Sequence, residues 1–238
     1  MRAAGLDARA HAPRMYGSLG RGVFELMWLA CRGRAALADI TEVPAPAARA
    51  LEGALAHGRG VVLAASHTGN WDLAAAAIAQ RVPLLVVTKR LSMRALDAFW
   101  QSTRQALGVS LAAADGAMAP ARAALARGSA VAMMIDQVPQ RARHAVRGTF
   151  LGREAWLDKT PAVLAARSGA PLVAAAAWRR PDGTHELAAL RVIVPPAHPD
   201  AAWIEGATRA VNEALDAFVR EHPESWLWMH RRWKTPPR

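Results

Sequence analysis

Two residues of this chain, His67 and Asp72, could most directly carry out chemistry, with four residues between them. They follow the apolar run 60–66, at what we interpret as a turn from a strand to a helix. A neutral imidazole can take a proton from an alcohol, and a carboxylate on its other nitrogen fixes the tautomer and stabilises the developing positive charge. The pair therefore predicts direct attack of a substrate hydroxyl on an activated acyl group, with His67 as general base.

A His-x4-Asp spacing is a short pattern, and such patterns also occur by chance. In the alternative interpretation, the two side chains only cap a helix or hydrogen-bond a loop. The elements around the pair and the motifs further along the chain favour the catalytic interpretation.

Apolar strands and helices alternate along the chain. The runs 60–66, 83–87 and 130–135 are continuously apolar, which is typical of parallel strands buried on both faces. Helices are predicted at 18–40, 47–57, 70–80, 92–107, 117–127, 160–168 and 201–222, further strands at 109–112, 171–178 and 185–194, and a polar loop at 139–148. We expect an α/β fold with a mostly parallel central sheet, helices on both faces, and an antiparallel pair at 171–194.

The predicted strand ends bring several candidate residues together. In open α/β sheets, ligands bind at the carboxyl ends of the strands. His67, Lys89 and Asp136 each follow a predicted strand, so we expect them to share one cleft. The turn at Gly69 and Asn70 also starts a helix, whose free N–H groups favour negative charge and could stabilise an oxyanion or a phosphate.

Length and charge narrow the class of protein. The chain has 238 residues, which suits one domain, and its net charge is +11. Such a charge favours anionic partners: phosphorylated lipids, an acidic carrier protein, a membrane surface or nucleic acid. Six arginines fall within the first 34 residues, and Arg231, Arg232 and Lys234 form a second cluster beside tryptophans. The single cysteine, Cys31, excludes an internal disulfide and a cysteine-based metal site, as expected in a reducing cytoplasm.

No run approaches the ~20 apolar residues that a membrane-spanning helix needs. The segment 23–31 is shorter and contains Glu25. With arginines on both sides and Trp28 inside, it could lie in a membrane interface as an amphipathic helix, or pack on the core as an ordinary helix. A signal peptide is not apparent either.

Several ordered motifs carry a family resemblance. They are Ser-His-Thr-Gly-Asn-Trp-Asp at 66–72, Arg104 followed by Gly108, Ile-Asp-Gln at 135–137, Gly-Thr-Phe-Leu-Gly at 148–152, Thr-Pro at 160–161, and the ending 223–234 with Trp-x-Trp-x-His-Arg-Arg-Trp-Lys. Over most of residues 60–234, the chain resembles the bacterial lipid A biosynthesis acyltransferases, the lauroyl/myristoyl transferases of the lysophospholipid acyltransferase superfamily.

The resemblance implies a glycerolipid acyltransferase-like fold and transfer of a fatty acyl chain from a thioester donor, usually acyl carrier protein, to a hydroxyl. The acceptor would be a lipid or glycolipid such as a lipid A precursor. The resemblance also implies peripheral work at the cytoplasmic face of the bacterial inner membrane, without a metal or organic cofactor. Residues 59–238 would form the acyltransferase region, and residues 1–58 a helical region that could contact the membrane, within a single domain.

The resemblance also implies roles for single residues. His67 corresponds to the general base and Asp72 to its orienting carboxylate. Arg104 matches a position associated with the polar substrate, where a guanidinium suits phosphate oxygens. Lys89 offers a further anion contact. To Asp136, in another motif of the family, we assign a part in site architecture.

Other assignments stay open. Relatives with the same box acylate phosphatidylinositol mannosides, ornithine-type lipids or amino-acid amines, so the box predicts the reaction better than the acceptor. From other classes, the charge would suit a nucleic-acid-binding protein, and a membrane-binding homologue without activity would keep the fold. The sequence contains no recognisable nucleic-acid recognition element, close histidine pair or nucleotide-binding loop, so we predict no nucleic acid, metal or cofactor. We interpret His230 as structural, because one base suffices.

Overall fold

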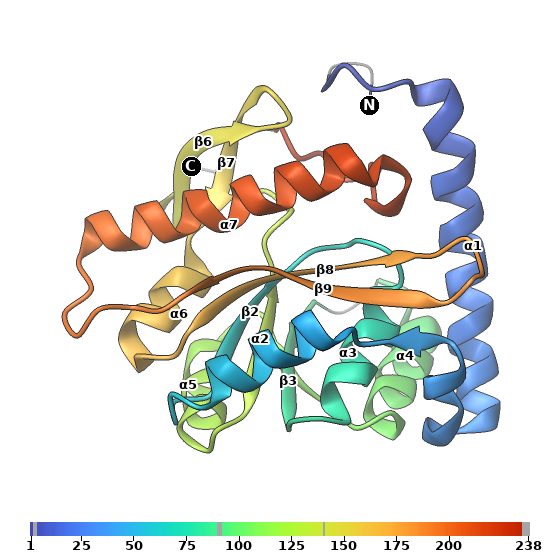
Figure 1. Ribbon diagram of the computed structural model, residues 1–238, viewed down its shortest axis with the longest axis horizontal. Coiled ribbons are helices and arrows are strands. Elements are labelled where there is room, and N and C mark those ends of the chain that lie inside the picture. The colour runs from blue at the N-terminus through green and yellow to red at the C-terminus, as the bar shows by residue number, and fades with distance from the viewer. Residues whose placement is uncertain (2–3, 90–91, 140, 235–238) are drawn as a thin grey trace.

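A seven-stranded sheet forms the centre of the molecule (Figure 1). The structure is a computed structural model that describes residues 1, 4–89, 92–139 and 141–234. The strands of the sheet are Thr41–Glu42 (β1), Val61–Ala65 (β2), Leu84–Thr88 (β3), Val109–Ala113 (β4), Ala130–Met134 (β5), Leu172–Arg179 (β8) and His185–Ile193 (β9). They lie in the order β1-β9-β8-β2-β5-β3-β4, and each neighbouring pair is parallel except β8 and β9. The predicted α/β fold with a mostly parallel sheet is confirmed.

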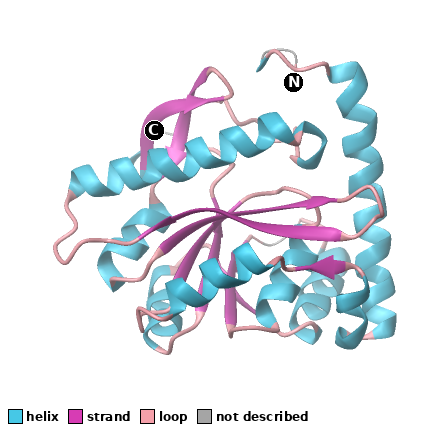
Figure 2. Cartoon of the chain, viewed as in Figure 1, coloured by secondary structure: helices cyan, strands magenta, loops and turns pink. Residues whose placement is uncertain are grey.

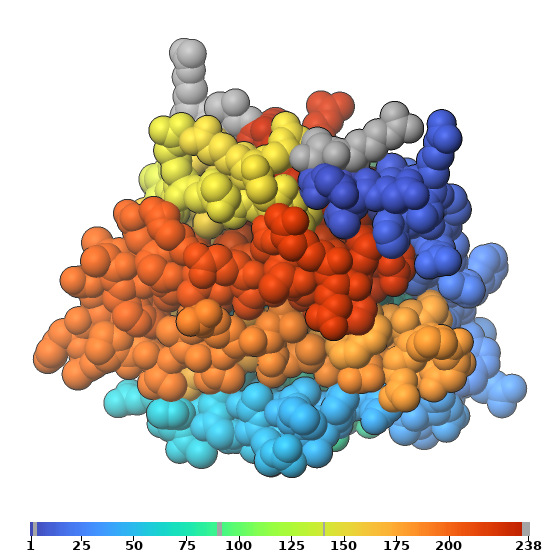
Figure 3. Space-filling view, turned by 45° about the horizontal axis from the view of Figure 1, so that its top comes forward, coloured from blue at the N-terminus to red at the C-terminus, as the bar shows by residue number. Residues whose placement is uncertain are grey.

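Helices cover both faces of this sheet, as Figure 2 shows. They are Ala8–Arg32 (α1), Ala45–Leu55 (α2), Trp71–Ala79 (α3), Arg94–Ala106 (α4), Met118–Ala126 (α5), Thr160–Ser168 (α6) and Ala201–Glu221 (α7). Successive side chains of β2 point to opposite faces: Val62 belongs to the core beneath α5, α6 and α7, and Val61 to the core beneath α2 and α3. In the space-filling view, α7 and the β8–β9 pair form two bands across the visible face, and α2 lies below them (Figure 3).

The register of the two central strands places their ends side by side. Val61 pairs with Ala130 and Ala65 with Met134, so β2 and β5 run in parallel over their whole length. The chain therefore leaves both strands at the same edge of the sheet. Residues 66–67 and 135–136 come together there, although they are far apart in sequence.

The first helix differs from its predicted bounds of 18–40. α1 begins at Ala8, where the Asp7 side chain accepts a hydrogen bond from the backbone N–H of Arg9, and it continues through Pro13. It ends at Gly33, whose φ is +79°, and a short 3₁₀ helix at Arg34–Asp39 follows. Proline and several glycines conceal the helix start in the sequence. No helix among the residues that the structure describes is long and apolar enough to cross a bilayer.

A two-stranded antiparallel hairpin, Ala145–Phe150 (β6) and Arg153–Asp158 (β7), was not predicted. The polar loop predicted at 139–148 overlaps the first strand of this hairpin, and that part of the prediction is wrong. Leu151 and Gly152 both have positive φ at its tip, as a tight hairpin turn of the primed type needs. Phe150 and Leu157 are buried, so the hairpin attaches to the main core through a few apolar side chains.

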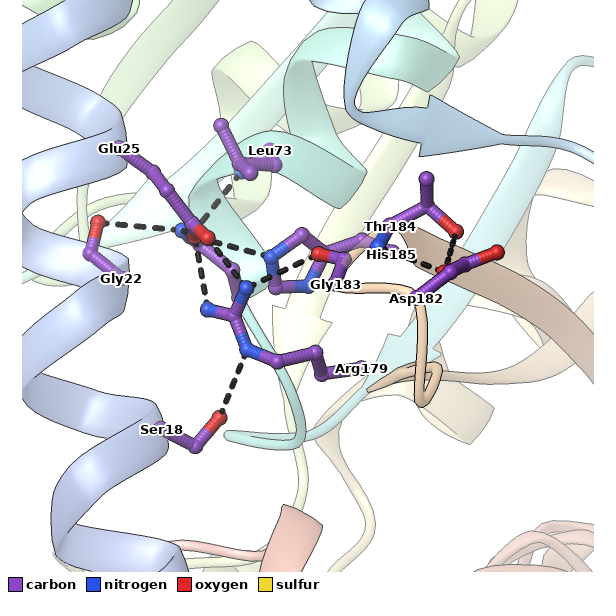
Figure 4. Close-up of polar contacts among 10 residues, drawn as sticks. Ser18, Gly22, Glu25, Leu73, Arg179, Asp182, Gly183, Thr184 and His185 are labelled. Carbon is purple, nitrogen blue, oxygen red and sulfur yellow. Dashed lines mark hydrogen bonds and ion pairs between the residues drawn. The ribbon is translucent and has the colours of Figure 1, made fainter.

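Glu25 of α1 ties this helix to the sheet (Figure 4). Its carboxylate accepts hydrogen bonds from both Nη groups of Arg179, at the end of β8. Nε2 of His185, the first residue of β9, lies 2.9 Å from Glu25 Oε2, and the side-chain amide of Asn70 donates to the same oxygen at 3.2 Å. Burial alone would raise the pKa of Glu25, but these hydrogen bonds and the charge of His185 outweigh it and lower the pKa to about 2. Glu25 is therefore ionised in the folded protein at neutral pH.

We predict that Glu25→Gln removes an acid-sensitive part of the stability. An unfolded glutamate has a pKa of ~4.3, above the folded value, so the ionised group stabilises the fold above that pH and loses its contribution as the pH falls towards 2. The variant should lose up to roughly 3 kcal/mol of unfolding free energy at pH 7. Its stability should also change less between pH 4.5 and 2. Urea unfolding at several pH values measures both effects.

Glu52→Gln is the matched control for this substitution, because Glu52 is exposed on α2. It should leave the acid limb of the stability profile unchanged. An equally steep acid limb in Glu25→Gln would contradict the assignment of that limb to Glu25.

Candidate active site

The turn after β2 carries His67, and the buried carboxylate of Asp136 holds it in place. The backbone N–H of His67 donates to Asp136 Oδ2 at 2.9 Å, and Nδ1 of the ring lies 2.9 Å from Asp136 Oδ1. Because an ionised carboxylate only accepts, the proton of a neutral imidazole sits on Nδ1. Nε2 then keeps a lone pair and can accept a proton.

Asp136 is completely buried and remains charged. Burial would raise its pKa, but the charge of His67, the two hydrogen bonds from that residue and a third from Trp226 hold the pKa well below the usual range. Nε1 of Trp226 donates to Asp136 Oδ2 at 2.9 Å. A permanent negative charge therefore lies behind the imidazole, where it stabilises the imidazolium form.

The partner of Asp72 differs from the expectation. Asp72 Oδ1 accepts a hydrogen bond from Nε of Arg104 at 2.6 Å, and Oδ2 accepts one from Nε1 of Trp100 at 2.7 Å. Both partners belong to α4, towards which the first turn of α3 directs Asp72. The carboxylate on the ring of His67 is thus that of Asp136, and Arg104, expected to contact a phosphate, is paired with Asp72.

The backbone after His67 is also partnered differently from the expectation. The N–H of Gly69 donates to the carbonyl of Ser225 at 2.8 Å, so it is not free to hold an oxyanion as expected. A Cβ at Gly69 would lie 2.6 Å from the carbonyl oxygen of Ala177, and φ is +57°, so this turn requires glycine. The side-chain oxygen of Asn70 caps α3 by accepting from the N–H of Leu73 at 3.3 Å.

Residues 223–234, which we name the C-terminal segment, pack against this turn. The N–H of Leu227 donates to the carbonyl of His67 at 2.9 Å, and Thr68 and Trp226 form an isolated antiparallel bridge. Arg232 anchors the segment: its guanidinium is buried and donates to the carbonyl of Trp156 at 2.5 Å. Burial lowers the pKa of Arg232 to about 10, against the charges of Asp136 and Asp158. The tryptophan-rich ending thus holds the turn that carries His67.

His230, which the sequence analysis interprets as structural, lines the cavity beside His67. Its ring stands edge-on to that of His67, with 4.6 Å between the centroids, while the ring of Trp71 lies 5.0 Å from His67. Burial, helped by the charges of His67 and Lys89 and opposed by Asp136, lowers the pKa of His230. The sequence places His230 within the motif at 223–234, but it does not reveal His67 as the neighbouring ring.

His67, Asp136 and His230 each offer one possible metal-ligand atom, and these atoms lie within 4.8 Å of one another. Both oxygens of Asp136 already accept hydrogen bonds from His67, and one also accepts from Trp226. A metal ion bound here would compete with the bond that orients the imidazole.

One cavity of about 1020 Å³ connects the polar residues to the apolar interior. The predicted site residues His67, Gly69, Asn70, Asp72, Lys89 and Arg104 all line it. Asp136 lies directly behind His67, to which it is hydrogen-bonded. Apolar side chains continue the wall between the sheet and the helices α2 and α3: Leu51, Leu63, Ala75, Ile78, Val86, Val109, Ala132 and Val173. The cavity therefore combines a base with room for a long apolar group.

Comparison with known proteins agrees with this chemistry. The sequence profile described as "Bacterial lipid A biosynthesis acyltransferase" matches residues 9–235. "Phosphatidylinositol mannoside acyltransferase" of Mycolicibacterium smegmatis is 28% identical over 183 residues, which are 76% of this chain and 59% of that protein. The protein of the same name from Mycobacterium tuberculosis strain H37Rv is 28% identical over 190 residues, 77% of this chain and 57% of that protein. The chain thus spans less than two thirds of the length of these relatives. Since the profile covers nearly the whole chain, the chain belongs to the bacterial lipid A biosynthesis acyltransferase family.

Proposed function

We propose that this protein transfers a fatty acyl chain from a thioester donor to a hydroxyl of a lipid acceptor. The observation that carries the proposal is the His67–Asp136 pair beside the large, mainly apolar cavity. The family description and the acyltransferase names of the two relatives support the same reaction. Acyl carrier protein is the donor that the family suggests. A lipid A precursor or a phosphatidylinositol mannoside would each offer a suitable acceptor hydroxyl.

In the proposed reaction, Nε2 of His67 takes the proton of the acceptor hydroxyl while its oxygen forms a bond to the thioester carbonyl carbon. The tetrahedral anion then collapses, the carbon–sulfur bond breaks, and the imidazolium returns the proton to the leaving sulfur. Asp136 stabilises the imidazolium in between and keeps the ring in the reactive tautomer, as the 2.9 Å contact with Nδ1 supports.

The tetrahedral anion needs positive charge beside His67. We assign this role to Lys89 and to the amino end of α3, where Asn70 is the cap. The N–H of Gly69 is left out of this assignment, because it donates to Ser225. Asp72 and Arg104 also line the cavity, and their ion pair would position the acceptor as a unit.

The acyl chain would lie along the apolar wall under the sheet, and the acceptor would enter from the polar end. That end carries Lys89, Arg141, Arg143 and His144, which suits an acceptor or donor with phosphate groups. Hydrocarbon in the apolar part would leave water and gain ~0.8 kcal/mol per methylene.

We further propose peripheral binding to the cytoplasmic face of a bacterial inner membrane through residues 1–58 and the neighbouring helix α4. Large apolar side chains are exposed on α1 and α4, which lie against one another. We name this surface the α1–α4 apolar face: Tyr16, Phe24, Met27, Trp28, Met93, Leu96 and Phe99. Arg14, Arg21 and Arg32 are exposed along α1 and would meet anionic lipid headgroups. Residues 59–238 would supply the catalytic machinery.

His67→Ala should lower turnover by ~10²–10⁴-fold, because the reaction loses its base. The assay follows acyl transfer from an acyl thioester into the lipid fraction, with the product identified by mass spectrometry. His57→Ala is the control, since His57 is exposed after α2. Near-normal turnover by a folded His67→Ala protein would rule out this mechanism.

Asp136→Asn should lower kcat more than Asp72→Asn, although Asp72 belongs to the His-x4-Asp box. The first substitution removes the charge behind the imidazole, and the second weakens an ion pair that does not touch the ring. Comparison of kcat and KM for the two variants measures the difference. A lower kcat in Asp72→Asn than in Asp136→Asn would contradict this assignment and indicate that Asp72 orients the imidazole.

Ala132→Leu should shift donor preference towards shorter acyl chains. Ala132 lines the apolar part of the cavity from the middle of β5, and a larger side chain there would shorten the available space. Each excluded methylene should cost about fourfold in relative use, from ~0.8 kcal/mol. Competition among donors of different length, read by mass spectrometry, tests this. Ala56→Leu, at an exposed site, should keep the original preference, and an unchanged preference in Ala132→Leu would place the acyl chain elsewhere.

A further inference from the structure

Neighbouring residues of α1 face opposite environments. Phe24 is 72% exposed and belongs to the α1–α4 apolar face. Glu25, the next residue, points inward to Arg179 and His185, and its side chain is only 19% exposed. One turn of helix therefore reaches both the outer surface and the interior.

The inward contacts of α1 end on the active-site turn. The side-chain amide of Asn70 donates to the Glu25 carboxylate and to the carbonyl of Gly22, each at 3.2 Å. A Cβ added at Gly22 would lie 3.2 Å from Nδ2 of Asn70, so the helix backbone approaches this amide closely. These two contacts fix the direction in which the Asn70 side chain points.

Asn70 in turn sets the geometry next to the base. Its side-chain oxygen caps α3 through the N–H of Leu73. The first residue of α3 is Trp71, whose ring lies 5.0 Å from that of His67. A rotated or released Asn70 would free the start of α3, and with it the ring that packs on His67.

We propose that Glu25 couples lipid binding to catalysis: docking of α1 on an anionic membrane surface holds Asn70, and therefore His67, in the active arrangement. This inference rests on the proposed acyl-transfer function. A ligand shifts such an equilibrium only if it binds one arrangement better. An anionic bilayer meets that condition, because it binds best to the arrangement in which α1 presents its apolar residues and arginines outward. In this arrangement, Glu25 is in contact with Arg179 and His185 in the interior. Glu25 is thus a positioning residue that acts through Asn70.

Arginines beside the apolar residues specify the occupant of this surface. Arg14, Arg21 and Arg32 are spaced by seven and eleven residues, which puts them on one side of a helix. All three are exposed and flank Phe24 and Trp28. The interface of an anionic bilayer offers phosphates to these arginines and hydrocarbon to the exposed Phe24 and Trp28 between them, so it matches both features of this surface.

The experiment distinguishes activation of the enzyme by the membrane from a higher local concentration of lipid substrate at the membrane. Hydrolysis of hexanoyl-coenzyme A, a water-soluble thioester, is followed by thiol release with and without vesicles of phosphatidic acid and phosphatidylcholine, two lipids without a free alcohol group that could act as acceptor. In this assay water replaces the acceptor hydroxyl and yields hexanoate and the free thiol. Vesicles should raise the wild-type rate constant about tenfold, within the roughly 5- to 150-fold range of known couplings. Glu25→Gln, compared at vesicle concentrations at which a flotation assay shows all of the protein bound, should gain less than about twofold.

Two further variants complete the set. Glu52→Gln, which changes an exposed glutamate of α2, should respond to vesicles like the wild type. Gly22→Ala keeps the ion pair of Glu25 with Arg179 but adds a methyl group against Asn70. It should lose activation as well, even if Glu25→Gln proves too unstable to assay.

Hydrogen exchange of the amides in residues 67–73 provides a readout without substrate. Vesicles should slow this exchange in the wild type and leave it unchanged in Gly22→Ala. If vesicles activated the wild type, Glu25→Gln and Gly22→Ala equally, the coupling would be overturned. Unchanged hydrogen exchange in the wild type on addition of vesicles would also overturn it. A wild type that shows the exchange effect but no thioester cleavage would instead overturn the proposed reaction.

Discussion

The site depends on the buried negative charge of the Asp136 carboxylate. A bare charge in a protein interior is strongly unfavourable, and it persists only where hydrogen bonds and opposite charges compensate it. Here three N–H groups converge on it, from the backbone and ring of His67 and from Trp226. The same contacts that make the charge tolerable also aim the imidazole into the cavity. Compensation of the buried charge and orientation of the His67 ring therefore depend on the same hydrogen bonds.

The sheet could be predicted from sequence, because buried parallel strands leave a local signature of continuous apolar residues. The pairing of His67 could not. His67 and Asp72 are close along the chain, but the start of α3 turns Asp72 towards Arg104 of α4. The pairing with Asp136 follows from the parallel register of β2 and β5, which no local spacing encodes.

The errors in the helical and hairpin regions have similar causes. α1 runs through Pro13, which local rules treat as a break, because the Asp7 cap starts the helix well before it. The hairpin β6–β7 has polar outer residues and resembles a loop in sequence, and only the burial of Phe150 and Leu157 reveals it. His230 and Glu25 lack any sequence neighbour that would reveal their roles, since their partners come from distant elements.

Alanine has a structural meaning in the strands around the cavity. Ala65, Ala132 and Ala175–Ala177 all line it, where bulkier residues would fill the space with side chains. These small side chains leave the cavity open, while Leu63 and Val173 make its lining apolar. The alanines of these strands thus leave room for a ligand.

The C-terminal segment has a consequence for biosynthesis. Trp226 supplies the last N–H group to the buried carboxylate, and Leu227 and Ser225 form backbone hydrogen bonds with His67 and Gly69. Translation proceeds from the amino end, and domains complete their folding as the chain emerges. A nascent chain therefore cannot complete the hydrogen bonds around His67 and Asp136 until residues beyond 226 have left the ribosome.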